Sequence, residues 1–227
     1  MKFLQVLDGA EVLSQSGDPD IAGVEYDSRR VKPGFLFVAM KGEATDGNRF
    51  IYKAIANGAV AIVSDVFDNS AQANGGLEWA APTNQEKEGA FIAWARVPHG
   101  RRALARVSAN FYHRPAEKLA NTGVTGTNGK TTTAFLIESV LKFAGRGSVL
   151  VGTIEYHVLD KVISAPHTTP ESLELNQMFA EALAEGATET VMEVSSHALD
   201  QQRMYGIPYD VAIFTNLTRD HLDYHQT

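Results

Sequence analysis

The sequence predicts an α/β fold built from mostly parallel strands with helices between them. The order helix, glycine, apolar strand occurs three times in its 227 residues. The strands in this order are short, unbroken apolar runs, which are typical of strands buried on both faces of a parallel sheet. Apolar residues make up 44% and charged residues 21%, as in an ordinary globular protein. Together these observations indicate α/β architecture with right-handed crossovers.

The first half of the chain contains the first example of this order. A Pro-Gly turn precedes the apolar run of residues 35–39, which predicts a buried strand. Residues 50–57 have the apolar spacing of a helix, Gly58 follows, and residues 59–63 form the next expected strand. Residues 68–89 are rich in Asn, Gln, Ala, Gly and Glu, and they predict a long surface loop.

The second half repeats the order twice. Expected helices cover residues 101–112, 131–144 and 172–185, and expected strands cover residues 119–124, 148–152 and 190–194. In the helix over 131–144, four apolar residues share one side: Phe135, Leu136, Val140 and Leu141. We place a domain boundary near Pro98, which divides the chain into domains of residues 1–98 and 99–227.

Composition excludes several classes of protein. The formal net charge is −7, whereas a nucleic-acid-binding protein would present a basic face. The absence of cysteine excludes disulfide scaffolds, thiolate zinc sites and cysteine nucleophiles. The N-terminus lacks the pattern of a signal peptide, and no apolar run approaches the ~20 residues of a membrane span. We expect a cytoplasmic protein that binds neither nucleic acid nor membrane.

A glycine-rich loop is the most informative stretch of the chain. Residues 125–132 read Thr-Gly-Thr-Asn-Gly-Lys-Thr-Thr between an expected strand and an expected helix. Glycines allow a tight turn whose N–H groups face one centre, and the helix adds its positive end. Lys130 would reach the outer phosphates of a nucleotide, and the Thr131 hydroxyl would bind Mg²⁺. The strict P-loop pattern fails, because Val124 stands where it requires glycine. The competing interpretation is a glycine-rich turn with a solvated lysine.

This loop resembles the nucleotide loop of the Mur ligases, which are ATP-dependent amide-forming enzymes of peptidoglycan precursor synthesis. Four further stretches are similar to one branch of the family: Asp27-Ser28-Arg29, Thr168-Thr169-Pro170, Glu193-Val194-Ser195-Ser196-His197, and the run from Thr215 to His225. The resemblance extends from about residue 24 to residue 227. It implies an N-terminal domain that binds a UDP-sugar and a central, P-loop type ATP-binding domain, and we expect the central domain to be incomplete here.

The resemblance also implies roles for individual residues, with ATP and Mg²⁺ as cofactors. The expected ATP-binding residues are Gly126, Thr127, Asn128, Gly129, Lys130, Thr131 and Thr132. The expected metal ligands are Thr131, Glu193 and His221, and the expected catalytic residues are Lys130, Glu193 and His221. The expected substrate-binding residues are Tyr26, Ser28, Glu43, Ala44, Thr45, His167, Thr168, Thr169, Ser195, Gln201 and Arg203.

Simpler structural interpretations compete with several of these roles. Thr168 or Thr169 could cap the following helix, with Pro170 in its first turn. The stretch around Asp27 could be a turn that satisfies its own backbone. Glu193 ends an apolar strand, where α/β sheets place ligand sites, but a carboxylate there could instead bond to a neighbouring helix.

The histidines suggest two other kinds of site, a zinc site and the active site of a serine hydrolase. His221 and His225 would share a helix face, but they lack an obvious third ligand for zinc. Ser195-Ser196-His197 invites a serine hydrolase interpretation. Residues adjacent in sequence do not easily form a nucleophile–base pair, and no Gly-x-Ser-x-Gly elbow occurs.

The implied reaction joins the γ-carboxylate of the D-Glu in UDP-MurNAc-L-Ala-D-Glu to the amino group of a diamino acid, meso-diaminopimelate or L-lysine. ATP would activate the carboxylate as an acyl phosphate. Two parts of the family's active site, a carbamylated lysine and a third domain, would follow residue 227. We therefore expect a monomer of 227 residues that binds its ligands weakly and does not ligate them. The alternatives are a related ligase of the folylpolyglutamate type, a P-loop kinase or ATPase, and a P-loop nucleotide-binding module without ligase activity.

Overall fold

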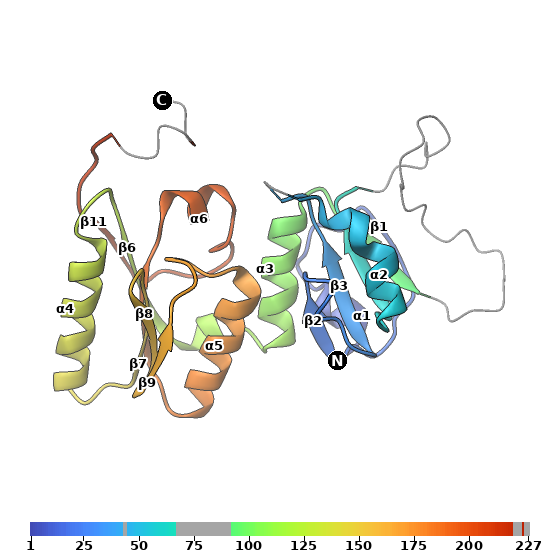
Figure 1. Ribbon diagram of the computed structural model, residues 1–227. Coiled ribbons are helices and arrows are strands. Elements are labelled where there is room, and N and C mark those ends of the chain that lie inside the picture. The colour runs from blue at the N-terminus through green and yellow to red at the C-terminus, as the bar shows by residue number, and fades with distance from the viewer. Residues whose placement is uncertain (43–44, 67–91, 220–223, 225–227) are drawn as a thin grey trace. The chain divides into compact units, whose positions relative to one another are not determined.

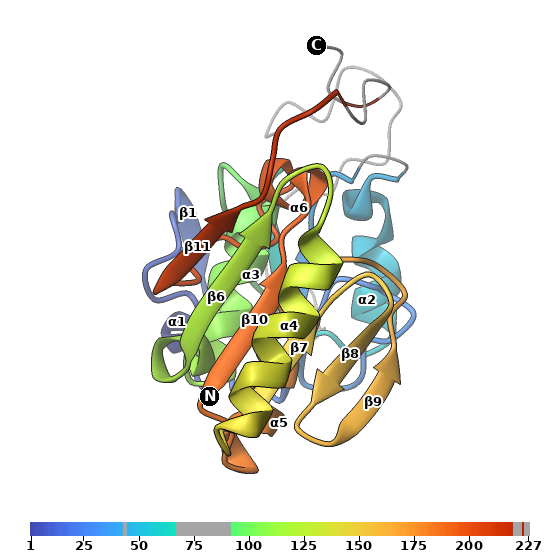
Figure 2. The ribbon, with the colours of Figure 1, turned by 90° about the vertical axis from the view of Figure 1, so that its left-hand side faces the viewer.

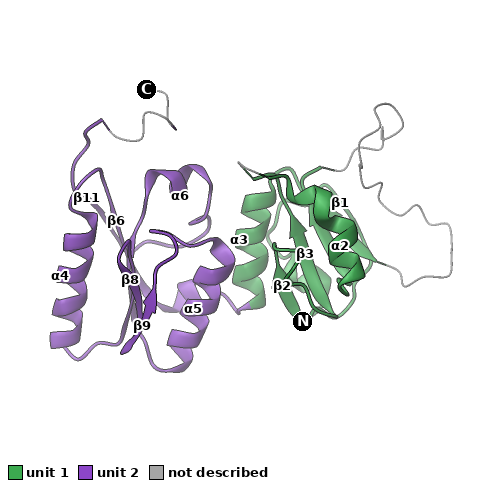
Figure 3. Cartoon of the chain, viewed as in Figure 1, with its two compact units in different colours: residues 1–111 green, residues 112–227 purple. Residues whose placement is uncertain are grey.

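The computed structural model describes residues 1–42, 45–66, 92–219 and 224. The chain forms two compact units, Met1–Phe111 and Tyr112–Thr227 (Figure 3). Each unit contains one mostly parallel sheet with helices packed on it, so the predicted α/β class is confirmed. The expected loop over 68–89 lies outside the described residues. In the described part of the chain, no helix is long and apolar enough to cross a membrane.

The described residues of unit 1 form a sheet of five strands in the order β1-β5-β4-β3-β2 (Figure 1). Its strands are β1 (Ser14–Ser16), β2 (Gly23–Glu25), β3 (Phe35–Ala39), β4 (Ala61–Ser64) and β5 (Ala93–Arg96). Among these five strands, β1 runs antiparallel to its neighbour and the others are parallel. The helices of this unit are α1 (Phe3–Val6), the 3₁₀ turn η1 (Gly47–Phe50), α2 (Ile51–Ala56) and α3 (Gly100–Phe111).

Helices α2 and α3 lie on opposite faces of this sheet (Figure 1). Ile51 and Ala54 of α2 pack against Phe37 and Ile62. Helix α3 packs on α1 and on β2, β3 and β4. The sequence-based boundary near Pro98 assigns this helix to the second domain, whereas the structure places it in the first compact unit. The reason is that the apolar side of α3 packs on the strands of the first sheet.

The sheet of unit 2 has six strands in the order β11-β6-β10-β7-β8-β9 (Figure 2). These strands are β6 (Ala120–Thr125), β7 (Ser148–Val151), β8 (Glu155–Val158), β9 (Lys161–Ser164), β10 (Glu189–Glu193) and β11 (Val211–Phe214). Strands β11, β6, β10 and β7 are parallel, and β8 and β9 form an antiparallel edge. The helices are the 3₁₀ turn η2 (Pro115–Lys118), α4 (Lys130–Phe143), α5 (Ser172–Ala184) and α6 (Ser196–Asp200).

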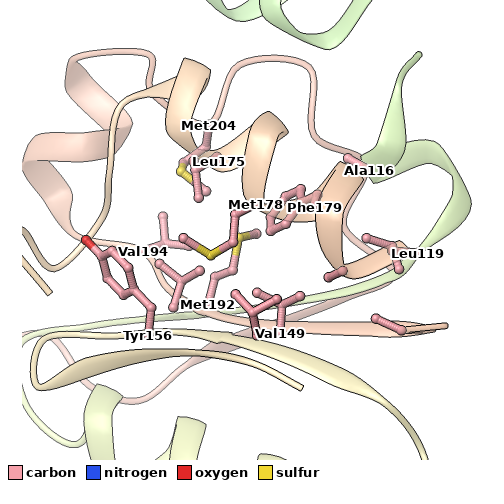
Figure 4. Packing of buried hydrophobic residues seen from close by; sticks show 14 residues of the cluster. Ala116, Leu119, Val149, Tyr156, Leu175, Met178, Phe179, Met192, Val194 and Met204 are labelled. Atoms are coloured by element: carbon pink, nitrogen blue, oxygen red, sulfur yellow. The ribbon is translucent and has the colours of Figure 1, made fainter. Parts of the chain in front are cut away.

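Helices α4 and α5 cover opposite faces of this second sheet (Figure 1). On the α5 side, Leu175 and Phe179 pack with Val149 and Met192 of the strands (Figure 4). On the α4 side a smaller cluster is formed by Val124, Ala134, Leu150 and Val191, with Phe135, Ile137, Leu141 and Ile213 packed against it. The alternating faces of the same strands therefore supply both layers of the core.

The buried side of α4 differs from the side that the apolar pattern indicates. Leu136 and Val140 are mostly exposed, at 62% and 68%, whereas Phe135 and Leu141 pack on the core. Glu138 is buried in their place and is paired with His157. The spacing of apolar residues predicted the wrong side of α4, because the side that is buried includes the charged residue Glu138.

Candidate active site

Four chain segments meet at the carboxyl edge of the parallel strands of unit 2. Strands β11, β6, β10 and β7 run in one direction, so their carboxyl ends share an edge of the sheet. The glycine-rich loop follows β6, Glu193 ends β10, Thr153 follows β7 and Thr215 follows β11. Ligand sites of open α/β sheets lie at this edge.

Glu193 is the buried carboxylate of this edge. The residue is completely buried, and three donors contact its two oxygens. The N–H of Thr153 donates to Oε1 over 2.9 Å. The hydroxyls of Thr131 and Thr153 lie 2.9 and 3.1 Å from Oε2. These bonds offset the desolvation of the carboxylate and hold it against the first turn of α4.

Lys130 begins α4 at the end of the glycine-rich loop. Its ammonium group donates to the carbonyl oxygens of Gly126 and Thr127, over 2.6 and 3.1 Å. The turn depends on glycine: Gly126 has φ +130°, and a Cβ there would collide with the hydroxyl of Thr215. The positive charge therefore lies over the loop that the sequence predicts to hold phosphates.

The segment after β11 is hydrogen-bonded to this loop. The N–H groups of Thr127 and Asn128 donate to the carbonyl and side-chain oxygens of Asn216, over 3.0 and 3.1 Å. The Thr215 hydroxyl donates to the carbonyl of Asn128 over 2.7 Å. Two of the loop amides expected to face phosphate, those of Thr127 and Asn128, are thus hydrogen-bonded to Asn216. The first N–H groups of a helix have no partner within it, so those from Gly129 onward suit an anion best.

A second cluster forms around Arg203. Its guanidinium donates to the Thr169 carbonyl over 2.7 Å and to the side-chain oxygen of Gln201 over 2.7 and 3.1 Å. It also pairs with Glu171 at 3.1 Å. Ser195 donates its N–H to the Thr169 hydroxyl over 3.3 Å. The structure thus brings together Thr169, Ser195, Gln201 and Arg203, four of the residues expected to bind substrate.

Thr169 acts differently from a helix cap. Helix α5 begins at Ser172 with Glu171 as its N-cap, and no side chain caps it. The Thr169 hydroxyl instead donates to the carbonyl of Glu193 over 2.9 Å. The capping interpretation of Thr168 and Thr169 is therefore wrong. The helix starts too late for either hydroxyl to reach its first amides.

His167 and Thr168 directly precede Thr169 in the chain. The carbonyl of His167 accepts a hydrogen bond from the hydroxyl of Tyr156, and the His167 side chain is exposed. Burial raises the pKa of the Tyr156 hydroxyl above its ordinary value. The Thr168 hydroxyl lies 3.2 Å from that of Thr153. The Thr168 hydroxyl is thus linked to Glu193 through Thr153, whose hydroxyl contacts both.

The remaining described candidates, Tyr26, Ser28 and Thr45, belong to unit 1. Ser28 is buried, and its carbonyl accepts a bond from Asn57 over 2.8 Å. Thr45 is exposed and accepts the Gly42 N–H at its carbonyl over 3.0 Å. Glu43 and Ala44 lie outside the described residues.

The turn before Ser28 is fixed by an ion pair. The guanidinium of Arg29 contacts both carboxylate oxygens of Asp27 at 2.6–3.1 Å, and the Arg29 N–H adds a bond of 2.9 Å. This contact lowers the pKa of Asp27 to about 2, with the side-chain hydrogen bond as the largest cause. The arrangement matches a turn that satisfies its own backbone, and the substrate role of Ser28 stays a prediction.

The donor set at Glu193 fits Mg²⁺ bound together with a nucleotide. Mg²⁺ prefers oxygen ligands and usually takes one or two from protein and others from phosphates. Thr131 and Glu193 supply two such oxygens in contact with each other. Within the described ranges, no group of three or more His, Asp or Glu residues could hold a metal ion alone. His221, the third expected ligand, and His225 of the zinc alternative lie outside those ranges.

Two protein-family descriptions match this chain, and together they show the family to which it belongs. The family described as Mur ligase, catalytic domain matches residues 20–112, and the Mur ligase middle domain matches residues 124–227. The chain belongs to the Mur ligase family. The two matched regions correspond closely to the two compact units.

Individual relatives of this Mur ligase chain carry a more specific name. The ligase of Solibacter usitatus called UDP-N-acetylmuramoyl-L-alanyl-D-glutamate–2,6-diaminopimelate ligase is 48% identical over 206 residues. That match covers 91% of this chain and 38% of the relative. The Clostridium tetani protein of the same name is 44% identical, covering 100% of this chain and 44% of its own. The chain thus spans about two fifths of the length of these relatives.

Solved structures agree with this relationship. A structure of a UDP-N-acetylmuramoyl-L-alanyl-D-glutamate–2,6-diaminopimelate ligase matches with TM-score 0.69 and 30% identity, over 91% of this chain and 38% of that one. The MurF ligase of Thermotoga maritima in complex with ADP matches with TM-score 0.56 and 24% identity, over 90% of this chain and 39% of that one. At 24% identity, the match to this MurF ligase shows only that the two chains share a fold.

Sequence reasoning missed two residues of this candidate site. Thr153 contacts both oxygens of Glu193, and Asn216 binds two amides of the glycine-rich loop. Thr153 stands in a short turn with no motif around it. Asn216 belongs to a stretch that resembles the family, but its contact with the loop depends on β11 pairing beside β6. A predicted strand order was the missing information in both cases.

Proposed function

We propose that this chain is the nucleotide-binding and UDP-sugar-binding part of an ATP-dependent ligase that adds diaminopimelate to UDP-N-acetylmuramoyl-L-alanyl-D-glutamate. The observation that carries the proposal is the contact between Thr131 and Glu193 beside a glycine-rich loop. It places an oxygen pair suited to Mg²⁺ at the start of a helix suited to phosphate. The names of the relatives support the choice of substrate.

Each part of the site has a task in this proposal. When bound, ATP would supply the phosphoryl group that activates the substrate carboxylate as an acyl phosphate, with ADP as the leaving group. Lys130 neutralises charge on the phosphates, which is the main requirement of phosphoryl transfer. Thr131 and Glu193 would hold Mg²⁺. Lys130 must leave its two loop carbonyls for this role, and a phosphate oxygen is the stronger acceptor.

The cluster around Arg203 suits the substrate. Its guanidinium is held in a fixed direction by Gln201 and Glu171, and a planar fork of donors matches carboxylates and phosphates. Beside it, the Thr169 hydroxyl accepts the Ser195 N–H, and the Ser195 hydroxyl accepts the Ala198 N–H at the start of α6. The proposal assigns this cluster to the anionic end of the UDP-sugar peptide. We further propose that the protein acts in the cytoplasm, where nucleotide-linked precursors are made.

Direct binding to the 227-residue chain tests the proposal. We expect AMP-PNP with Mg²⁺ and, separately, UDP-MurNAc-L-Ala-D-Glu to bind in NMR titrations. Lys130→Ala should weaken AMP-PNP binding by at least about tenfold, because a charge-assisted contact is lost. Lys118→Ala is the matched control, since Lys118 is an exposed lysine of the same unit, and it should leave binding unchanged.

Two results would contradict the proposal. Equal AMP-PNP affinity of Lys130→Ala and the unaltered chain would show that the loop does not hold phosphate. Binding of AMP-PNP without any binding of the UDP-sugar peptide would favour a plain nucleotide-binding module. Glu193→Gln adds a further check, because the dependence of AMP-PNP binding on Mg²⁺ should disappear while the fold persists.

A further inference from the structure

Thr153 connects the proposed metal site with the proposed substrate site. Its hydroxyl oxygen lies 3.1 Å from Oε2 of Glu193 and 3.2 Å from the hydroxyl oxygen of Thr168. Its N–H donates to the other oxygen of Glu193 over 2.9 Å. Thr153 itself is exposed, so neither contact is a by-product of core packing.

The directions of these hydrogen bonds follow from counting protons. A threonine hydroxyl has one proton and two acceptor sites. If the Thr153 proton pointed at Thr168, a lone pair of its oxygen would face the carboxylate of Glu193 at 3.1 Å, which is repulsive. The proton therefore points at Glu193, because a bond to a carboxylate is stronger than one to a neutral oxygen. Thr168 must then donate its own proton to Thr153.

We propose that Thr153 is a positioning residue that couples binding of Mg²⁺–nucleotide at Glu193 to binding of the UDP-sugar peptide at Thr168. This inference rests on the proposed function of the same site. In the ligand-free chain the proton of Thr168 is committed to Thr153. A cation that shares the charge of Glu193 weakens the carboxylate as an acceptor, and the Thr153 proton then turns toward Thr168. The proton of Thr168 is thereby released to donate to an oxygen of the substrate.

The predicted coupling has a definite sign and size. Mg²⁺–nucleotide should tighten binding of the UDP-sugar peptide, and the peptide should tighten binding of the nucleotide by the same factor. One neutral hydrogen bond changes partner in the process, which corresponds to about threefold to tenfold in affinity. Nucleotide with EDTA in place of Mg²⁺ should give no such enhancement.

The test is a set of calorimetric or NMR titrations with UDP-MurNAc-L-Ala-D-Glu, with and without saturating AMP-PNP and Mg²⁺. The Thr153→Val variant keeps the shape and the backbone N–H but loses the hydroxyl. It should bind the peptide alone at least as tightly as the unaltered chain, because Thr168 is free to donate, while the enhancement by Mg²⁺–nucleotide falls to about onefold. Thr153→Ser restores the hydroxyl and should restore the enhancement.

Controls separate this role from a merely structural one. Thr188→Val removes a hydroxyl at an exposed position of the same unit and should keep the full enhancement. If Thr153→Val only damaged the structure, it would lower the affinity for the nucleotide and the affinity for the peptide, and Thr153→Ser would not selectively restore the coupling. That result would overturn the inference. An undiminished enhancement in Thr153→Val also overturns it, while leaving the proposed function intact. Failure of the unaltered chain to bind either ligand would overturn the proposed function and the inference together.

Discussion

At the scale of single residues, Glu193 shows how this chain tolerates a charge in its interior. A buried carboxylate is costly unless donors replace its water shell. Here one amide and two hydroxyls do so, and they come from α4 and from the turn after β7. The same donors leave the carboxylate directed toward the start of α4. These bonds compensate the burial of the carboxylate at the end of β10.

Asp27 provides a residue-scale prediction about pH. Its contact with Arg29 lowers its pKa from an ordinary value of 3.8 to about 2 in the folded protein. The folded pKa lies below the unfolded one, so the contribution to stability is complete above the unfolded value and is lost as the pH falls through about 2. We expect NMR titration of the Asp27 carboxyl carbon to give a midpoint near this lower value.

The control variants for Asp27 are Arg29→Ala and Lys32→Ala. Loss of Arg29 should return the Asp27 midpoint toward its ordinary value, whereas loss of the nearby exposed Lys32 should leave it unchanged. The effect on overall stability should be small, because the Arg29 side chain is 77% exposed and solvent and salt screen the pair. An ordinary midpoint in the unaltered protein would disprove the assigned cause.

At the scale of elements, α4 shows what the sequence could and could not predict. The glycine-rich loop, the helix after it and the strand after that were expected within about two residues of their observed bounds, since glycines and apolar runs mark them locally. The buried side of α4 was not predicted correctly. It depends on Glu138, whose partner His157 lies on β8, and no local pattern connects those two residues.

Glu138 and His157 form a buried contact that ties α4 to β8. Glu138 Oε1 lies 2.6 Å from His157 Nδ1 and 2.9 Å from the ammonium of Lys142. The other ring nitrogen of His157 lies 2.9 Å from Glu155, and the ring packs edge-on to Phe135. Because both Glu138 and His157 are buried, removal of either should cost stability: Glu138 would keep only Lys142, and His157 would keep only Glu155, among the partners named here.

A double-mutant cycle tests this element-scale contact. Glu138→Gln and His157→Gln should each lower the free energy of unfolding by about 1–3 kcal/mol in urea titrations. The double variant should lose less than the sum, with a coupling of about 1–2 kcal/mol. The exposed pair Lys161 and Glu185 is the matched comparison, and its cycle should show little coupling. Additive losses at Glu138 and His157 would contradict the contact.

At the scale of the whole molecule, the chain consists of two units, and each has its own sheet and core. The α/β class of both could be predicted from local patterns. The boundary between them could not, because Pro98 and the following glycine look like a linker in the sequence. Whether a helix belongs to the unit before it or the unit after it is decided by the sheet that it covers, which is tertiary information.

The boundary leads to a prediction about fragments. Helix α3 packs on β2, β3 and β4 and buries Ala103, Leu104 and Val107, and Asn110 donates to the carbonyls of Val6 and Asp8 over 2.9 and 2.7 Å. We expect the fragment 1–111 to give a dispersed NMR spectrum and a cooperative unfolding transition. The fragment 1–98 lacks α3, which leaves one face of the sheet uncovered, and it should not fold.

A point variant that weakens the packing of α3 without deleting the helix puts a number on the difference between the fragments 1–111 and 1–98. Leu104→Ala in the fragment 1–111 should lower the free energy of unfolding by about 2–5 kcal/mol, as for other large-to-small changes in a core. Typical domains have a total of about 5–15 kcal/mol, so deletion of the whole helix exceeds what the fragment can lose. A cooperatively folded fragment 1–98 would show that α3 is an accessory of the first sheet and would move the boundary back to Pro98.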